Sequence, residues 1–294
     1  MRYVYKFIGF FFLFVGALFF FGQDIPEISV ATTTTVSLQK STFPLLYLQT
    51  GNYTVNTLHG YSSEMYSGSI RESITPLDEK KTLIAKIKEN ESKIKRLDYE
   101  LTDIANNKVI ETNTLTSFET QEGCRTAAIK LTAGLDTSVE YGFSITLTTN
   151  VSKRIYFYTR IKYYNTDFYL AEKLNFITDF HDATLGENKD FDISPYLELN
   201  TNDDSTFANV DIHSNRNLIM WRKLNPSVIS EIVPTINEIN IETAAVSFDY
   251  FVEADTDSAR ETYYVKEFYR VRYSGSRIYL LAFKRTMEAF LTRI

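Results

Sequence analysis

The chain has 294 residues, a formal net charge of −6 and a single cysteine. Its length predicts more than one folded domain, and its acidic balance gives no support for nucleic-acid binding, which requires a basic surface. One cysteine excludes an internal disulfide. If the chain is exported, its lack of disulfides is more typical of a protein on a bacterial surface than of one that follows a eukaryotic secretory route.

A hydrophobic segment opens the chain. Residues Phe7 to Gly22 carry no charge and half of them are Phe. As a helix this run is roughly 24 Å long, and neighbouring tyrosines extend it toward the ~30 Å hydrocarbon core of a membrane. The pattern predicts a transmembrane helix within residues 1–25.

The charges beside this segment predict its orientation. Arg2 and Lys6 precede the run, whereas Asp24 and Glu27 follow it. Because positive charge stays on the cytoplasmic side, we expect a single-pass protein of the cell membrane, with a cytoplasmic N-terminus and an extracytoplasmic bulk. A cleaved signal peptide, cut after Ser29-Val30-Ala31, is the alternative. With an anchor or with a cleaved signal peptide, the rest of the chain is expected to be exported.

Residues 26–42 predict a linker, since they show no periodic apolar pattern. A strand over 43–49 and a second over 53–59 are then expected on either side of the turn residues Gly51-Asn52. The stretch 60–77 is rich in Ser and Gly and predicts a surface loop.

From Thr82 to Tyr163 the apolar residues recur with period two. Phe143, Ile145 and Leu147, for example, alternate with hydroxyl residues. Strands every ten to fifteen residues with turns between them predict a β-sandwich domain over residues 43–164.

The segment Leu135 to Phe143 resembles the end of a fibronectin type III or immunoglobulin-like domain. In those domains a tyrosine near the start of the penultimate strand forms a tyrosine corner, and the resemblance assigns Tyr141 to this position. The immunoglobulin Cys…Trp…Cys signature is absent, so the resemblance implies only the general sandwich class.

The composition changes near Asn165. Leu174, Ile177 and His181 lie on one stripe of a predicted helix that starts after Thr166 or Asp167 and ends at Gly186. A strand is predicted at 217–221 and three more over 244–252, 262–273 and 278–283, with a short helix over 286–294. A helix followed by an antiparallel meander is an order of elements that resembles NTF2-like folds. This resemblance implies an α+β domain with a curved antiparallel sheet over residues 165–294.

The whole chain also resembles uncharacterised membrane-anchored extracytoplasmic proteins of clostridial bacteria. Four segments carry this resemblance: Leu58-His59-Gly60-Tyr61, Ile74-Thr75-Pro76-Leu77, Ala171-Glu172-Lys173-Leu174 and Tyr279-Leu280-Leu281. It implies location and architecture, and no function. An anchor followed by an NTF2-like domain also resembles a component of type IV secretion systems.

Motifs for catalysis are absent from the sequence: it has no P-loop, no G-x-G-x-x-G, no H-E-x-x-H and no G-x-S-x-G. We therefore expect no catalytic residue, no metal and no cofactor. The alternative is an enzyme with a pocket in the second domain, built from His181, Asp182, Asp211 and His213. Trp221 is predicted in the core, or as a platform in the same pocket.

The last predicted sandwich strand shows the clearest binding pattern. Aromatic and cationic residues alternate on one face: Arg154, Tyr156, Tyr158, Arg160 and Lys162. Such a face can stack on sugars or form the centre of an interface, or it can be a solvated sheet face or the contact with the next domain. The anchor, the two β-rich regions and the absence of catalytic motifs predict a non-enzymatic envelope protein, whose sandwich acts as a spacer or adhesive module and whose second domain binds a protein or a cell-wall polymer. A structural subunit of an envelope or secretion assembly is a further alternative.

Overall fold

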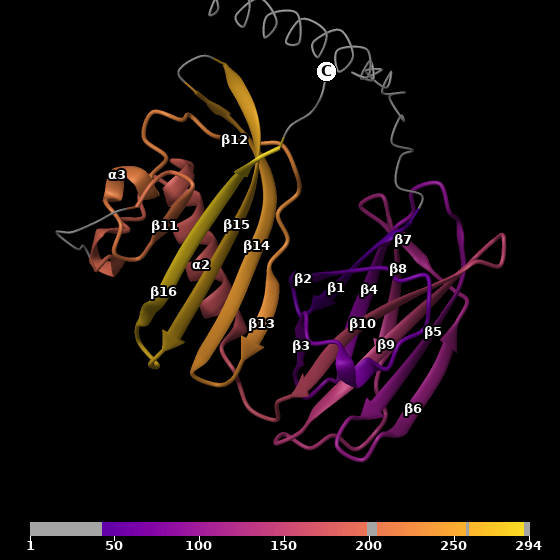
Figure 1. Ribbon diagram of the computed structural model, residues 1–294. Helices are drawn as coiled ribbons and strands as arrows, with labels where there is room; N and C mark the ends of the chain where they lie inside the picture. The colour runs from indigo at the N-terminus through magenta and orange to yellow at the C-terminus, as the bar shows by residue number, and fades with distance from the viewer. Residues whose placement is uncertain (1–42, 199–204, 257–258, 291–294) are drawn as a thin grey trace, which may run out of the picture. The chain divides into compact units, whose positions relative to one another are not determined.

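The computed structural model describes residues 43–198, 205–256 and 259–290. The predicted transmembrane segment and the linker up to residue 42 lie outside this range. Among the helices within these residues, none combines the length and apolar character needed to cross a membrane. All described residues belong to one compact unit (Figure 1).

The fold is mostly β-structure in antiparallel sheets. A first five-stranded sheet has the order β2-β1-β4-β8-β7. Its strands are β1 (Leu45–Thr50), β2 (Tyr53–Leu58), β4 (Thr82–Lys88), β7 (Glu119–Gln121) and β8 (Cys124–Lys130). Gly51 lies in the turn between β1 and β2 at φ +55°, a conformation that glycine adopts without steric cost. The two predicted N-terminal strands are thereby confirmed.

The second five-stranded sheet has the order β3-β10-β9-β5-β6. Its strands are β3 (Ile74–Leu77), β5 (Ile94–Asp103), β6 (Lys108–Leu115), β9 (Glu140–Thr149) and β10 (Arg154–Tyr163). Strand β3 pairs with β10 in parallel. The prediction of a plain surface loop over 60–77 is wrong at its end, because the loop ends in this strand. Parallel pairing with a strand more than eighty residues later leaves no local signal.

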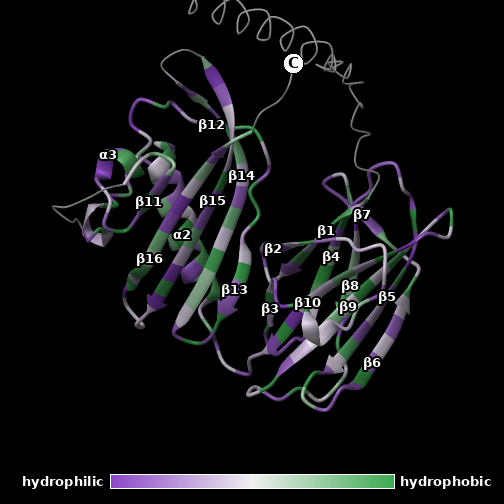
Figure 2. Cartoon of the chain, in the orientation of Figure 1, coloured by the Kyte–Doolittle hydropathy of each residue, from purple (hydrophilic) through white to green (hydrophobic). Residues whose placement is uncertain are grey.

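A single hydrophobic core joins these two sheets into a sandwich. Leu48 of β1 and Leu83 of β4 are fully buried together with Phe143 of β9 and Phe157 of β10. The buried positions alternate with half-exposed hydroxyl residues along β9, as the period of two predicts. Figure 2 shows this alternation as changing hydropathy along the strands. In the turn before β9, the hydroxyl of Tyr141 accepts a hydrogen bond from the Asp136 backbone N–H at 2.8 Å.

The second half of the chain forms a six-stranded sheet, in which five strands follow the order β11-β16-β15-β14-β12 and β13 pairs with β14. Its strands are β11 (Asn209–Asp211), β12 (Ser227–Val228), β13 (Thr235–Ile239), β14 (Thr243–Asp255), β15 (Arg260–Tyr273) and β16 (Ile278–Ala289). The predicted short helix over 286–294 is wrong over its first residues, because β16 extends to Ala289; residues 291–294 lie outside the described residues. Residues 286–289 pair with β15 in an antiparallel register, and the local sequence pattern does not indicate this pairing.

Helix α2 (Leu170–Leu185) packs against one face of this sheet. Leu174, Ile177 and Phe180 are buried on it, and Gly186 ends it at φ +80°, where a residue with a side chain would be strained. This confirms the predicted helix and its end. The predicted strand at 217–221 is wrong: a one-turn helix, α3 (Arg216–Ile219), forms instead, because the Asn215 side chain accepts a hydrogen bond from the Asn217 N–H and caps it.

Buried hydrogen bonds link the two halves of the compact unit. Asn56 of β2 is fully buried, and its backbone N–H donates to Pro234 O while its side-chain oxygen accepts from the Ile236 N–H, both at 2.8 Å. Its amide also donates to Ile74 O at 2.9 Å. One asparagine thus ties β2, β3 and the chain around β13 together.

Candidate functional site

The predicted binding face on β10 is only partly open to solvent. Arg154 is exposed and Tyr156 and Lys162 are half-buried, but Tyr158 is 3% exposed and Arg160 is 8% exposed. The two buried side chains do not point into free solvent as the simple alternation predicted.

The segment between β2 and β3 causes this burial, because it lies across the sheet. Tyr61 and Tyr156 exchange two backbone hydrogen bonds of 2.8 and 2.9 Å, and the Met65 N–H donates to the Tyr158 hydroxyl at 2.7 Å. Burial raises the pKa of Tyr158, so that this phenol remains neutral. The segment turns part of the sheet face into one wall of a groove.

Arg160 has a structural role. Its guanidinium forms an ion pair of 2.9 Å with Glu140 and donates through Nη2 to the Asn237 carbonyl at 3.0 Å. The second contact reaches the other half of the chain, which was one of the predicted alternatives for this face. The guanidinium of Arg160 is therefore not available to bind a polymer.

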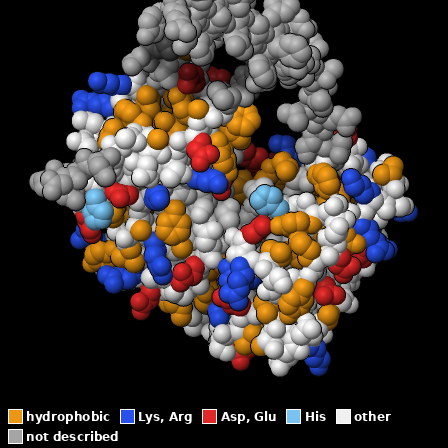
Figure 3. All heavy atoms as spheres, viewed as in Figure 1, with side chains coloured by type: hydrophobic (Ala, Val, Ile, Leu, Met, Phe, Trp, Pro, Cys, Tyr) orange, Lys and Arg blue, Asp and Glu red, His pale blue; other side chains and the backbone are white. Residues whose placement is uncertain are grey.

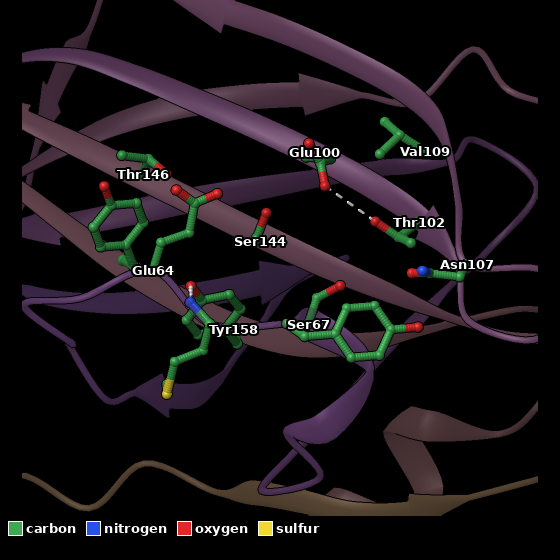
Figure 4. A pocket seen from close by; sticks show the side chains of 12 residues that line it. Glu64, Ser67, Glu100, Thr102, Asn107, Val109, Ser144, Thr146 and Tyr158 are labelled. Atoms are coloured by element: carbon green, nitrogen blue, oxygen red, sulfur yellow. Dashed lines mark hydrogen bonds between the residues drawn. The ribbon is translucent and has the colours of Figure 1, made fainter.

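A groove of about 310 Å³ opens between the β2–β3 segment and the outer face of the second sheet (Figure 4). A neighbouring hollow of about 230 Å³ continues it over β5, β6 and β9. We call the two together the outer-sheet groove. Both parts are lined by Glu64, Glu100, Ser144 and Thr146, and Tyr156 and Tyr158 line the first part.

The groove is polar and carries carboxylates. Figure 4 shows Glu64, Ser144 and Glu100 around the same opening, with Thr102 donating to Glu100 at 3.3 Å. In the second part Asp98 already pairs with Arg96 at 2.8 Å and accepts from the Thr114 hydroxyl at 2.6 Å. Carboxylates and hydroxyls offer hydrogen bonds to a polyol, and the two glutamates disfavour an anionic ligand.

Sequence reasoning missed the acidic lining of this groove. Ser144 and Thr146 were recognised as outward positions of β9, and Glu100 occupies the equivalent outward position of β5, opposite Ser144. The alternation therefore contained the signal for these three residues. The sequence contained no such signal for Glu64, because this residue reaches the groove from a segment outside any strand.

The histidines of the predicted pocket lie in different environments. His181 is 3% exposed on the buried face of α2, and its Nδ1 lies 2.7 Å from Glu267 Oε2. His213 is exposed, with Nδ1 2.8 Å from the Glu198 carbonyl. Asp211 accepts from the His213 N–H at 2.8 Å, and Asp182 is half-buried in the last turn of α2. Within the described ranges, no three His, Cys, Asp or Glu side chains gather closely enough to hold a metal ion.

His181 instead belongs to a buried polar network centred on Glu267 of β15. The Tyr269 hydroxyl donates to Glu267 Oε2 at 2.6 Å and the Tyr250 hydroxyl to Oε1 at 2.9 Å. Burial alone lowers the pKa of His181, but the Glu267 carboxylate outweighs it and raises that pKa above the ordinary value of 6.5. Burial alone would raise the pKa of Glu267, whereas His181 and its other partners hold it below 4.5.

Arg285 of β16 sits opposite Glu267 in the sheet and adds a second cation to the network. Its guanidinium stacks on Trp221, with 3.8 Å to the ring centroid, and donates to the Ile219 and Leu218 carbonyls at 2.8 Å each. Trp221 is 1% exposed and is a core residue. The network holds α2, α3 and the sheet together.

The face of the molecule in Figure 3 shows Lys, Arg, Asp and Glu side chains interspersed rather than separated by sign. Comparison with known proteins found no matching family model and no matching curated sequence.

Proposed function

We propose that this protein is a non-enzymatic binding protein of the bacterial cell envelope, whose outer-sheet groove binds a cell-wall glycan. The groove is the observation that carries the proposal. It combines hydroxyls, the three carboxylates of Glu64, Glu100 and Asp98, and the half-buried ring of Tyr156 along one sheet face, and such groups suit the hydroxyls and apolar faces of sugar rings. Its length over several strands suits a chain rather than a single small molecule.

The charge of the groove specifies which glycan fits. Glu64 and Glu100 line it, and the guanidinium of Arg160 is committed to Glu140 and Asn237. An uncharged or amine-bearing polysaccharide is therefore favoured, and a phosphate-rich wall polymer is disfavoured because like charges would meet in a partly desolvated site.

We also propose that the chain is anchored by residues 7–22, with its folded part on the outer side of the cell membrane. The uncharged run and the flanking charges support this topology. It would place the groove within reach of the wall, where a glycan ligand is abundant.

For the two folded regions we propose the finer relationships that the sequence suggests. The hydrogen bond between Asp136 N–H and the Tyr141 hydroxyl supports a fibronectin type III or immunoglobulin-like sandwich. A helix covering a sheet of three long antiparallel strands, β14 to β16, supports an NTF2-like second region.

The test is co-sedimentation of the full chain, purified in detergent, with cell-wall sacculi. Tyr156→Ala and Glu100→Gln should each weaken binding about tenfold, equivalent to ~1.4 kcal/mol. Tyr279→Ala is the matched control, because Tyr279 is an exposed tyrosine of β16 that does not line the groove. Equal binding by all three variants and the wild type would refute the glycan site.

A further inference from the structure

A second and larger opening lies where the sandwich meets the second half of the chain. It has a volume of about 760 Å³, within the range of pockets that hold small organic ligands, which often occur between domains. Strands β1 and β2 line one side, and residues 230–237 with β14 and β15 line the other. We call it the junction cleft. It shares no lining residue with the outer-sheet groove.

Buried hydrogen bonds fix the position of one wall of the junction cleft. Asn56 fixes Pro234 and Ile236 by two hydrogen bonds of 2.8 Å, and Arg160 fixes the Asn237 carbonyl. These bonds position the segment that forms one wall. A site that is formed before its ligand arrives loses little free energy in ordering when the ligand binds.

The cleft combines apolar walls with acidic groups. Leu45, which is 37% exposed, contributes apolar surface from the sandwich, and Val233 contributes it from the other side. Three carboxylates also line the cleft, namely Glu72, Glu231 and Asp249, against one lysine, Lys88, and one histidine, His59. The cleft therefore has an excess of negative charge over an apolar floor.

Tyrosine hydroxyls orient these carboxylates. Tyr61 donates to Glu72 at 2.7 Å, Tyr47 to Glu231 at 3.3 Å and Tyr264 to Asp249 at 2.8 Å. Burial, followed by the adjacent Glu231, raises the pKa of Tyr47 to about 12, so this phenol stays a donor at neutral pH. The Glu72 and Glu231 side chains remain 49% and 60% exposed and are thus accessible to a cation.

We propose that the junction cleft binds an organic cation with an apolar body, such as a primary amine carried on an aromatic or aliphatic chain. The apolar part would lie against Leu45 and Val233, and the ammonium group would donate to the carboxylates. Glu231 pairs with Lys88 at 3.8 Å, so an anion of the same size would meet three carboxylates offset by a single lysine. The tetrapeptide Leu58-His59-Gly60-Tyr61, singled out in the sequence, serves this site: Leu58, His59 and Gly60 line it, and His59 and Tyr61 hold Glu72.

The experiment compares three probes of one shape by saturation-transfer NMR titration against the full chain in detergent: 4-phenylbutylamine, 4-phenylbutanol and 4-phenylbutyrate. We expect the amine to bind about tenfold more tightly than the alcohol (~1.4 kcal/mol), and the carboxylate to bind most weakly. The triple variant Glu72→Gln/Glu231→Gln/Asp249→Asn keeps the shape of the cleft, removes all three of its carboxylates and should abolish the preference for the amine. Val233→Trp should fill the cleft and weaken all three probes.

Glu100→Gln is the control, since Glu100 lies in the outer-sheet groove, and it should leave amine binding unchanged. Circular dichroism establishes that each variant is folded, and the fluorescence of Trp221, the single tryptophan of the chain, supports it for every variant except Val233→Trp. Equal binding of the three probes, or a preference for the amine that survives the triple variant, would overturn the proposal. Because Glu100→Gln weakens only sacculus binding, failure at one site is distinguishable from failure at the other.

Discussion

Glu267 is the residue whose alteration should test the structure most severely. It is 1% exposed and accepts hydrogen bonds from His181, Tyr250 and Tyr269, with the Arg285 cation opposite it across the strands. Replacing Glu267 by Gln keeps the volume of the side chain and removes its charge. The imidazole and the guanidinium would then share a buried site without a counter-charge.

The expected cost follows from the loss of the carboxylate that pairs with the buried His181 at 2.7 Å. Removing one partner of a buried ion pair lowers the free energy of unfolding by about 3–5 kcal/mol. Because Gln preserves the packing, no cavity contribution is added. Tyr250→Phe removes a single hydrogen bond to the same carboxylate and should cost about 1.5–3 kcal/mol, so the two variants separate the charge from the bond.

The assay is urea denaturation of the full chain, followed by the fluorescence of Trp221. This is the only tryptophan, and it stacks on Arg285 at 3.8 Å, so it reports directly on the network. Glu261→Gln, at an exposed position of the same strand, should change stability by less than about 0.5 kcal/mol. If Glu267→Gln is no more destabilising than Glu261→Gln, the buried network does not stabilise the fold and the reasoning fails.

The network also sets a pH dependence with a definite sign. The folded pKa of His181 is raised, so its contribution is complete below the ordinary value of 6.5 and is lost as the pH rises through the folded pKa. The folded pKa of Glu267 is lowered, so its contribution is complete above 4.5 and is lost as the pH falls through the folded pKa. Stability from the pair should therefore be greatest between these values, and Glu267→Gln should remove the decline above pH 6.5.

Four further predictions concern other parts of the chain. Asn56→Ala deprives the buried Ile236 N–H of its acceptor and should lower the unfolding free energy by about 1–3 kcal/mol; urea denaturation measures it, and a change below about 0.5 kcal/mol would contradict the bridging role. Tyr141→Phe removes the acceptor of the Asp136 N–H and should cost about 1 kcal/mol in the same assay read by circular dichroism, with Tyr279→Phe as the neutral comparison. Gly60→Ala would put a methyl group 3.0 Å from Ile155 and 3.1 Å from Phe157, an overpacking expected to cost about 1–3 kcal/mol; unaltered thermal stability would mean that the loop shifts freely. N-terminal sequencing of the mature protein should read from the start of the chain, and a first residue of Thr32 would end the anchor proposal.

Much of the local structure was predictable because each element has its own periodicity. The alternation of Phe143, Ile145 and Leu147 predicted a strand with one buried face, and the stripe through Leu174 and Ile177 predicted α2 as far as Gly186. The errors fell where local pattern and tertiary partner disagreed. Residues 217–221 are apolar enough for a strand, but the Asn215 cap starts a helical turn there.

The candidate sites were only half predictable. Tyr156 was identified from the alternation of β10, yet its partners Glu64 and Glu100 come from a loop and from β5. Glu267 interrupts the apolar row of Val265, Tyr269 and Val271, and a charge in a buried row is itself a signal that a partner exists. The sequence did not reveal that this partner is His181, because the two residues are 86 positions apart.

What the sequence by itself determined is which residues face inward on each strand and helix, because side-chain direction follows from the period of the backbone. The tertiary structure alone decided which faces meet. The coverage of Tyr158 by the segment after β2, the tie made by Asn56 and the acidic lining of both openings depend on contacts between residues far apart in the chain. Such contacts form only when whole sheets pack, and no local pattern encodes their partners.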